Sequence, residues 1–172
     1  MIDVEGQGGA ENPFAIVSIL PAEEIWNYEI GLKSQWLDNR LGFDLSYFFF
    51  GGNRFRLQPE TTASLALVHE LALAGGAGVQ SMLSYTWRSK VYFENANTPI
   101  AGQDIAEDAV SLVGLNIGYT TADGDWRVGA YADNLLDKEY IIDAGNTGGA
   151  FGTPTFIAAP PRFYGVEVAY NF

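Results

Sequence analysis

Apolar and polar residues alternate along most of this chain with a period of two, and helical spacing is almost nowhere present. Successive side chains of a β-strand point to opposite faces, so this alternation predicts strands. Seven stretches of about ten residues show the pattern. They are residues 26–36, 41–50, 62–73, 79–92, 110–119, 126–135 and 162–172.

The last stretch, RFYGVEVAYNF, shows the two faces of a predicted strand most clearly. Its apolar face is formed by Tyr164, Val166, Val168, Tyr170 and Phe172. The alternate positions mix small, polar and charged residues, and the other stretches divide in the same way. The sequence therefore predicts an antiparallel sheet with one apolar and one mixed, polar face.

The length of the predicted strands and the alternation of short and long connections favour a transmembrane β-barrel over a soluble sheet. A tilted membrane-spanning strand needs about 9–11 residues, whereas soluble strands have a mode near 5–6. The connections alternate between short turns, at 37–40, 74–78 and 121–125, and long segments, at 51–60, 93–108 and 137–161. Outer-membrane barrels have short turns on one side of the membrane and long loops on the other.

Aromatic residues fall near the ends of the predicted strands. Amphipathic rings prefer the interfaces of a bilayer, so these positions predict an aromatic girdle around an apolar band. The candidate girdle residues are Trp26, Trp36, Tyr85, Trp87, Tyr119, Trp126 and Tyr164.

A soluble β-sandwich that binds carbohydrate is the all-β alternative. It would also alternate, but it would expose a uniformly polar face and cover the apolar face with a second sheet. Burial of Tyr164, Val166 and Val168 in a protein core would support it. The alternative that ranks ahead of this sandwich is a small self-contained or oligomeric outer-membrane barrel, porin-like or adhesin-like, which needs an eighth strand or other copies to close.

Composition narrows the class further. The chain has 172 residues, 48% of them apolar and 14% aromatic, which is too apolar for a disordered chain. No uncharged apolar run approaches the roughly 18 residues of a membrane helix. The net charge of −12 argues against nucleic-acid binding. Cysteine is absent, and residues 1–14 lack the features of a signal peptide.

No motif predicts catalysis. The many carboxylates show no marked pair, and His69 is expected to lie at an interface rather than on a metal. The glycine-rich segments lack the Lys-Ser/Thr of a phosphate-binding loop. We therefore expect neither an enzyme nor a cofactor. Arg88 and Lys90 are candidates for contact with anionic ligands or lipopolysaccharide, and Asp104, Glu107 and Asp108 for bridging lipopolysaccharide through divalent cations.

Three segments, in order, resemble the late barrel of TonB-dependent outer-membrane receptors. The first is WNYEIGLK followed by DNRL, the second is NLLDKEY, and the third is PPRFYGVEVAYNF at the C-terminus. The matching positions are Tyr28, Glu29, Gly31, Asn134, Leu135, Asp137, Tyr140, Pro161, Arg162 and Gly165. Together the segments cover most of residues 22–172.

The resemblance implies a function and an orientation. Receptors of this family take up a scarce nutrient such as a ferric siderophore, cobalamin or an oligosaccharide through a 22-stranded barrel plugged by an N-terminal domain. In that family the outer-membrane assembly machinery recognises the C-terminal aromatic residue of the last strand, so Phe172, Tyr170 and Val168 are the candidate assembly signal. Phe172 and the short turns would then be periplasmic and the long loops extracellular.

The expected organisation follows from this resemblance. Residues 1–24 would be the remnant of an extracellular loop, with a possible short strand at 14–20, and residues 25–172 would be a C-terminal barrel section. The plug, through which the family contacts TonB, has no counterpart among the matching segments. Seven strands leave two open edges that lipid cannot satisfy, so the sheet needs further strands.

Overall fold

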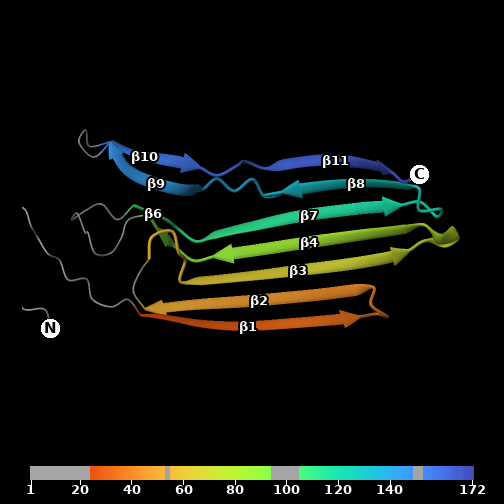
Figure 1. Ribbon diagram of the computed structural model, residues 1–172, viewed down its shortest axis with the longest axis horizontal. Helices are drawn as coiled ribbons and strands as arrows, with labels where there is room; N and C mark the ends of the chain where they lie inside the picture. The colour runs from red at the N-terminus through yellow and green to blue at the C-terminus, as the bar shows by residue number, and fades with distance from the viewer. Residues whose placement is uncertain (1–23, 53–54, 94–104, 149–152) are drawn as a thin grey trace, which may run out of the picture.

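The computed structural model describes residues 24–52, 55–93, 105–148 and 153–172. Its main element is one antiparallel sheet of seven strands, in the order β1-β2-β3-β4-β7-β8-β11 (Figure 1). The strands are β1 (Ile25–Trp36), β2 (Leu41–Gly52), β3 (Thr61–Ala72), β4 (Gly78–Arg88), β7 (Val110–Thr120), β8 (Trp126–Asp133) and β11 (Phe163–Tyr170). Each strand pairs with the one before it in this order, which confirms the predicted antiparallel meander.

Short turns join the strands at one end of the sheet, which we call the short-turn end. Between β1 and β2, Asp38 and Asn39 have φ angles of 56° and 67°, as in the hairpin turns whose twist matches that of the strands. The one-turn 3₁₀ helix η1 (Ala74–Gly76) lies between β3 and β4. The chain also ends at this end of the sheet (Figure 1).

The long connections gather at the opposite end, which we call the long-loop end. Two small hairpins form there: β5 (Val91–Tyr92) with β6 (Ala106–Glu107), and β9 (Ile141–Gly148) with β10 (Thr153–Ala158). We call these four strands, with Phe93 and Ile105, the rim module. Its buried cluster consists of Val91, Phe93 and Ala144, with Ile105 and Ile141 packed against it.

The structure corrects four of the predictions, two of them in the rim module. The stretch 79–92 is not one strand, because β4 ends at Arg88 and residues 91–92 pair with β6. Residues 137–161 are not an irregular loop, because β9 and β10 form a hairpin within them. The final strand ends at Tyr170 rather than Phe172, and β8 ends at Asp133 rather than at residue 135. The possible strand at 14–20 lies outside the described residues.

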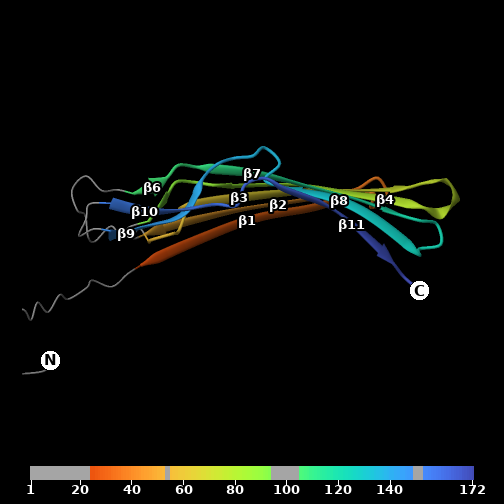
Figure 2. The same ribbon diagram turned by 90° about the horizontal axis from the view of Figure 1, so that it is seen from above.

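The seven-stranded sheet is curved and open (Figure 2). With an odd number of antiparallel strands, β1 and β11 run in the same direction, and they form its two edges. No helix in the described ranges is both long and apolar enough to cross a membrane.

Candidate functional site

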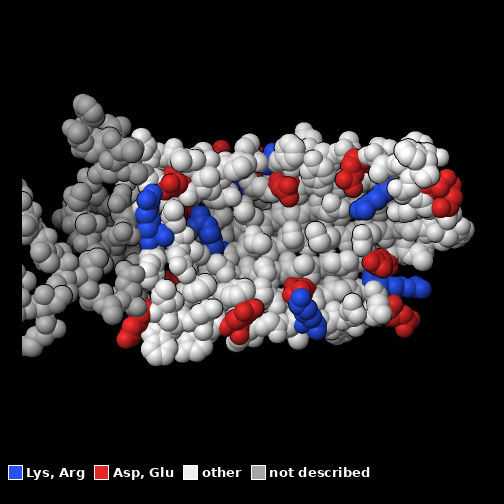
Figure 3. Space-filling model, viewed as in Figure 1, with Lys and Arg blue, Asp and Glu red and all other residues white. Residues whose placement is uncertain are grey.

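The two faces of the seven-stranded sheet differ completely in charge. Every Asp, Glu, Lys and Arg of these strands lies on one face, as the register between neighbouring strands shows. We call it the polar face, and Figure 3 shows the charged side chains spread over it. These residues are Glu29, Lys33, Asp44, Glu70, Arg88, Arg127, Asp133 and Glu167.

Most charges of the polar face have a partner on a neighbouring strand. Lys33 Nζ lies 3.0 Å from Asp44 Oδ2, and Arg127 Nε lies 3.8 Å from Glu167 Oε1. Gln80 Nε2 donates to Glu70 Oε1 at 3.1 Å. All these side chains are substantially exposed, so each pair is expected to contribute at most about 1 kcal/mol. These pairs connect neighbouring strands on a face that is exposed to solvent.

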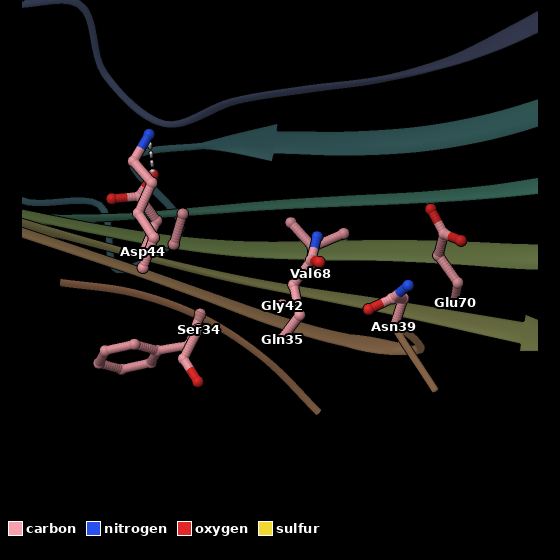
Figure 4. Close-up of a pocket in the computed structure, with 10 residues that line it drawn as sticks. Ser34, Gln35, Asn39, Gly42, Asp44, Val68 and Glu70 are labelled. Atoms are coloured by element: carbon pink, nitrogen blue, oxygen red, sulfur yellow. Dashed lines mark ion pairs between the residues drawn. The ribbon is translucent and has the colours of Figure 1, made fainter. Parts of the chain in front are cut away.

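A hollow lies on the polar face near the short-turn end. Figure 4 shows its lining, which includes Lys33, Asp44, Gln35, Gly42 and Glu70. It holds acidic, basic and amide groups, among them the paired Lys33 and Asp44, and it is an open trough rather than an enclosed pocket. Its chemistry suits a water-filled passage better than a tight ligand site.

Small residues on the polar face make room for large side chains of neighbouring strands. The ring of Tyr131 covers Gly165, where an added Cβ would come 2.7 Å from the Tyr131 hydroxyl oxygen. Glu167 covers Gly129 in the same way, 2.9 Å from an added Cβ. Gly129 and Gly165 therefore have a packing reason, since they leave room on the polar face for the side chains of Glu167 and Tyr131.

The opposite, apolar face is exposed. Ile30 is 71% exposed, Tyr164 73%, Val166 78% and Val168 64%. Among the described residues no second sheet covers this face, since the two small hairpins belong to the rim module. The burial that would support a soluble sandwich is therefore not found for Tyr164, Val166 and Val168.

The candidate girdle residues fall into two rows on the apolar face. Trp36, Tyr119 and Trp126 lie at the short-turn end, and Tyr170 joins them with its ring centroid 4.7 Å from that of Trp126. The long-loop end carries Trp26, Tyr85, Trp87 and Tyr164. The uncharged span between the rows is the feature that a bilayer core would require. His69 also lies on the apolar face, opposite Leu41 and Ser81.

The residues of the candidate assembly signal form the free end of the sheet. Val168 and Tyr170 lie on the apolar face of the edge strand β11. Phe172 follows the strand, fully exposed, with its ring centroid 5.8 Å from that of Tyr170. The backbone N–H of Asn171 still donates to Asp125 O at 2.8 Å, so the tail stays aligned with the neighbouring turn.

Asn134, Asp137 and Arg162, which carry the family resemblance between β8 and β11, form hydrogen bonds at the long-loop end that we call the polar clamp. The Asn134 side chain accepts a hydrogen bond from Lys138 N at 2.9 Å and donates one to Lys138 O at 3.0 Å. Asp137 Oδ1 accepts a hydrogen bond from Arg162 N at 3.0 Å. Asn134 and Asp137 both have positive φ angles, 50° and 55°. These residues hold the ends of β8 and β11 together, which is a structural task.

The remaining resemblance residues are placed as follows. Leu135 O accepts a hydrogen bond from Arg162 Nη1 at 3.5 Å, Tyr140 lies under the guanidinium of Arg88, and Pro161 lies two residues before the start of β11. On β1, Tyr28 belongs to the apolar face, whereas Glu29 and Gly31 belong to the polar face opposite Phe48 and Ser46.

One pocket on the polar face was missed by the sequence reasoning. It lies at the long-loop end, against the rim module, and combines Arg88 and Tyr140 with hydroxyl residues of three strands. The residues lining it are Ser46, Phe48, Thr62, Ala63, Ser64, Thr86, Trp87, Arg88, Val110, Leu112 and Tyr140. Arg88 itself was a candidate, but its neighbours come together only through strand register and the return of the chain at Tyr140.

The acidic loop candidates for cation bridging are engaged elsewhere. Glu107 Oε2 accepts a hydrogen bond from Ile141 N at 3.0 Å, and Asp108 Oδ1 lies 3.0 Å from Lys90 Nζ. Asp104 lies outside the described residues. Within the described part of the chain, no three His, Cys, Asp or Glu residues come together as a metal site would require.

Comparisons with known proteins support the fold. No family model matches the chain. Among solved structures, it is similar to the crystal structure of the ferric yersiniabactin uptake receptor FyuA from Yersinia pestis, with a TM-score of 0.72 and 14% identity. The match covers 87% of this chain and 24% of that receptor.

This likeness is one of fold. The chain shares its backbone arrangement with part of that receptor, and it spans only 24% of the receptor's length. At the level of the fold, it supports the predicted all-β sheet of long antiparallel strands.

Proposed function

We propose that this chain is a C-terminal section of the barrel wall of a TonB-dependent outer-membrane receptor. The observation that carries the proposal is the separation of charge between the two faces: the seven strands keep every Asp, Glu, Lys and Arg on one face while the other is apolar and exposed. A lipid bilayer is the solvent for which such a face is suited, because an apolar surface of this extent in water favours association.

The wall has a defined role in the proposed receptor. The polar face lines the lumen, the long loops lie outside the cell and gather ligand, and the short turns lie in the periplasm. Lipid and lipopolysaccharide contact the apolar face, and the assembly machinery binds β11 and Phe172. TonB acts only through a plug that these residues do not supply. The nutrient would be a ferric siderophore, cobalamin or an oligosaccharide.

The directions of the edge strands bear on the self-contained barrel alternative. Because β1 and β11 run in the same direction, closing the described sheet on itself would need a parallel pair. Antiparallel closure needs an odd number of further strands, which suits a section of a larger barrel better than a complete one.

The proposal is tested by exporting the chain behind an outer-membrane signal sequence in a Gram-negative bacterium. We expect it in the outer-membrane fraction only when the strands that complete the barrel are supplied, with protease added outside the cells cutting in the long loops. These residues alone should support no energised uptake. Recovery as a folded soluble protein, or energised uptake by cells expressing only these residues, would contradict it. Heat-modifiable migration of the chain alone would instead favour the self-contained barrel.

A further inference from the structure

Arg88 has a donor that no described residue satisfies. It is the last residue of β4 and lies half-buried on the polar face at the base of the rim module. Its Nη2 donates only a long, 3.5 Å bond to Ile141 O, and its guanidinium lies 5.8 Å from the ring centroid of Tyr140. Its Nη1 is buried and has no hydrogen-bond partner among the described residues. A buried cationic N–H without a partner costs free energy, so the geometry favours an acceptor at this position.

The nearby carboxylates do not supply that acceptor. Glu107 accepts the hydrogen bond of Ile141 N, and Asp143 pairs with Arg56 at 3.0 Å. Unlike Lys33, Lys90 and Arg127, Arg88 forms no ion pair with a described carboxylate. The guanidinium is therefore oriented by Tyr140 and Ile141 while its charge stays uncompensated within the described chain.

The space beside Arg88 has the lining of a binding site. The register places Thr62 of β3 and Val110 of β7 directly beside Arg88 on the same face. One residue pair deeper lie the hydroxyls of Ser46 and Ser64, whose oxygens are 2.6 Å apart, and Phe48 closes one side. Hydroxyl donors and a guanidinium thus meet apolar and aromatic walls in a single pocket.

We propose that the pocket beside Arg88 binds a carboxylate group attached to an apolar or aromatic body. A planar carboxylate matches the guanidinium fork, and the hydroxyls offer further donors to its oxygens. The apolar walls suit the body of the ligand. A singly charged carboxylate is favoured over doubly charged phosphate, because the chain carries a net charge of −12 that repels multiply charged anions.

The biological role of this pocket rests on the proposed function. In a receptor barrel, the pocket would be a ligand-binding position on the lumen wall, directly below the loops. The pocket itself is formed by described residues alone. Binding can therefore be measured whether or not the chain takes part in uptake, and the failure of one proposal is distinguishable from the failure of the other.

The test uses the full chain, labelled with ¹⁵N and assembled in detergent micelles with the unlabelled strands that complete the barrel, and titrates it with sodium benzoate. We expect saturable shifts of the amide signals of Thr62, Thr86 and Val110, with a dissociation constant on the order of 1 mM for so small a ligand. Arg88→Gln should weaken binding by about tenfold or more, because it removes a charge-assisted hydrogen bond, and Arg88→Lys should fall between. Inorganic phosphate and neutral benzamide should bind more weakly than benzoate.

Matched controls keep the result interpretable. Arg127→Gln removes another arginine of the polar face, one already paired with Glu167, and should leave benzoate binding unchanged. Thr86→Val removes a lining hydroxyl without removing charge and should weaken binding several-fold, so it serves if Arg88→Gln does not fold. Absence of saturation in the unmodified chain would overturn the proposal. So would unchanged binding in folded Arg88→Gln, or phosphate binding as tightly as benzoate.

Discussion

The seven-stranded sheet and the rim module are stabilised in opposite ways. The rim module buries its own apolar cluster: Phe93 and Ala144 are each 1% exposed. The sheet leaves its apolar side chains outside, with Ile30 at 71% and Val166 at 78%. One region therefore supplies its own core, whereas the other needs an apolar environment around it.

This difference indicates what each region requires for folding. The sheet gains its backbone hydrogen bonds from register, but its apolar face gains little until lipid replaces water. The rim module draws on side-chain packing between chain segments that are up to about fifty residues apart, such as Val91 and Ala144. Changes that affect one region should leave the other intact, and the following predictions address that separation from the largest expected effect to the smallest.

Phe93→Ala should disrupt the rim module. The ring is 1% exposed, and truncating a buried Phe typically costs about 3–5 kcal/mol through lost burial and a residual cavity. Hydrogen exchange should accelerate in β5 and β9 while β2 and β3 stay protected. Phe156→Ala, on the exposed side of β10 at 56%, is the matched control and should have little effect. Equal loss of protection in both regions would contradict their separation.

Leu83→Arg should destabilise the sheet in a bilayer. Leu83 lies in the middle of β4 on the apolar face, between Leu67 and Leu115. A charged residue at the midplane of a lipid-facing strand costs about 2–4 kcal/mol. Met82→Arg is an adjacent change of similar exposure, 42% against 41%, but on the polar face, and it should cost much less. Denaturant unfolding in phospholipid vesicles measures the free energy of unfolding of both variants. An equal decrease in the two would contradict the assignment of the two faces to different environments.

Asn134→Ala should loosen the clamp where the sheet meets the rim module. It removes two hydrogen bonds to Lys138 and places alanine at a φ of 50°, for a combined cost of about 2 kcal/mol. Asn134→Gly loses the same bonds without the backbone strain, so it should cost about 1 kcal/mol less. Exchange of the Lys138 amide reports both variants. Equal protection in the two variants would show that backbone strain plays no part.

The smallest effect is expected in the short turn between β7 and β8. The Thr121 hydroxyl donates to the Asp123 carboxylate, and this bond, with a further one from Asp125 N, lowers the pKa of Asp123 below 3.8. Such a turn is stabilised above pH 3.8 and loses that contribution as pH falls through the lowered pKa. Thr121→Val should move the pKa of Asp123 up toward 3.8, as followed by carboxyl ¹³C shifts, whereas Thr120→Val should not.

The sheet could be predicted from sequence because alternation encodes it locally. Each strand of the sheet separates apolar residues such as Leu83 from polar neighbours such as Ser84 without reference to the rest of the chain. The β9–β10 hairpin was not predicted, because its sequence lacks this alternation. Glycine and small residues between Ala144 and Thr153 leave no visible alternation, and the pairing is further broken by a register shift between Thr153 and Thr155.

The polar sites were less accessible to sequence reasoning. Arg88 was recognisable as a charged residue near a strand end, but its unpartnered nitrogen depends on Tyr140, which returns to it from beyond β8. The resemblance marked Asn134, Asp137 and Arg162, yet only their hydrogen bonds reveal a clamp. Both arrangements arise from tertiary contacts between distant segments, which local periodicity does not encode.

The central claim, that the two faces meet different solvents, can be tested on β4. The chain has no cysteine, so Leu83→Cys and Met82→Cys each introduce a single thiol for a spin label. In the chain assembled with its completing strands in a bilayer, the label at 83 should be accessible to oxygen and the label at 82 to a water-soluble nickel complex. Equal accessibility at the two positions, or aqueous access at 83, would contradict the account.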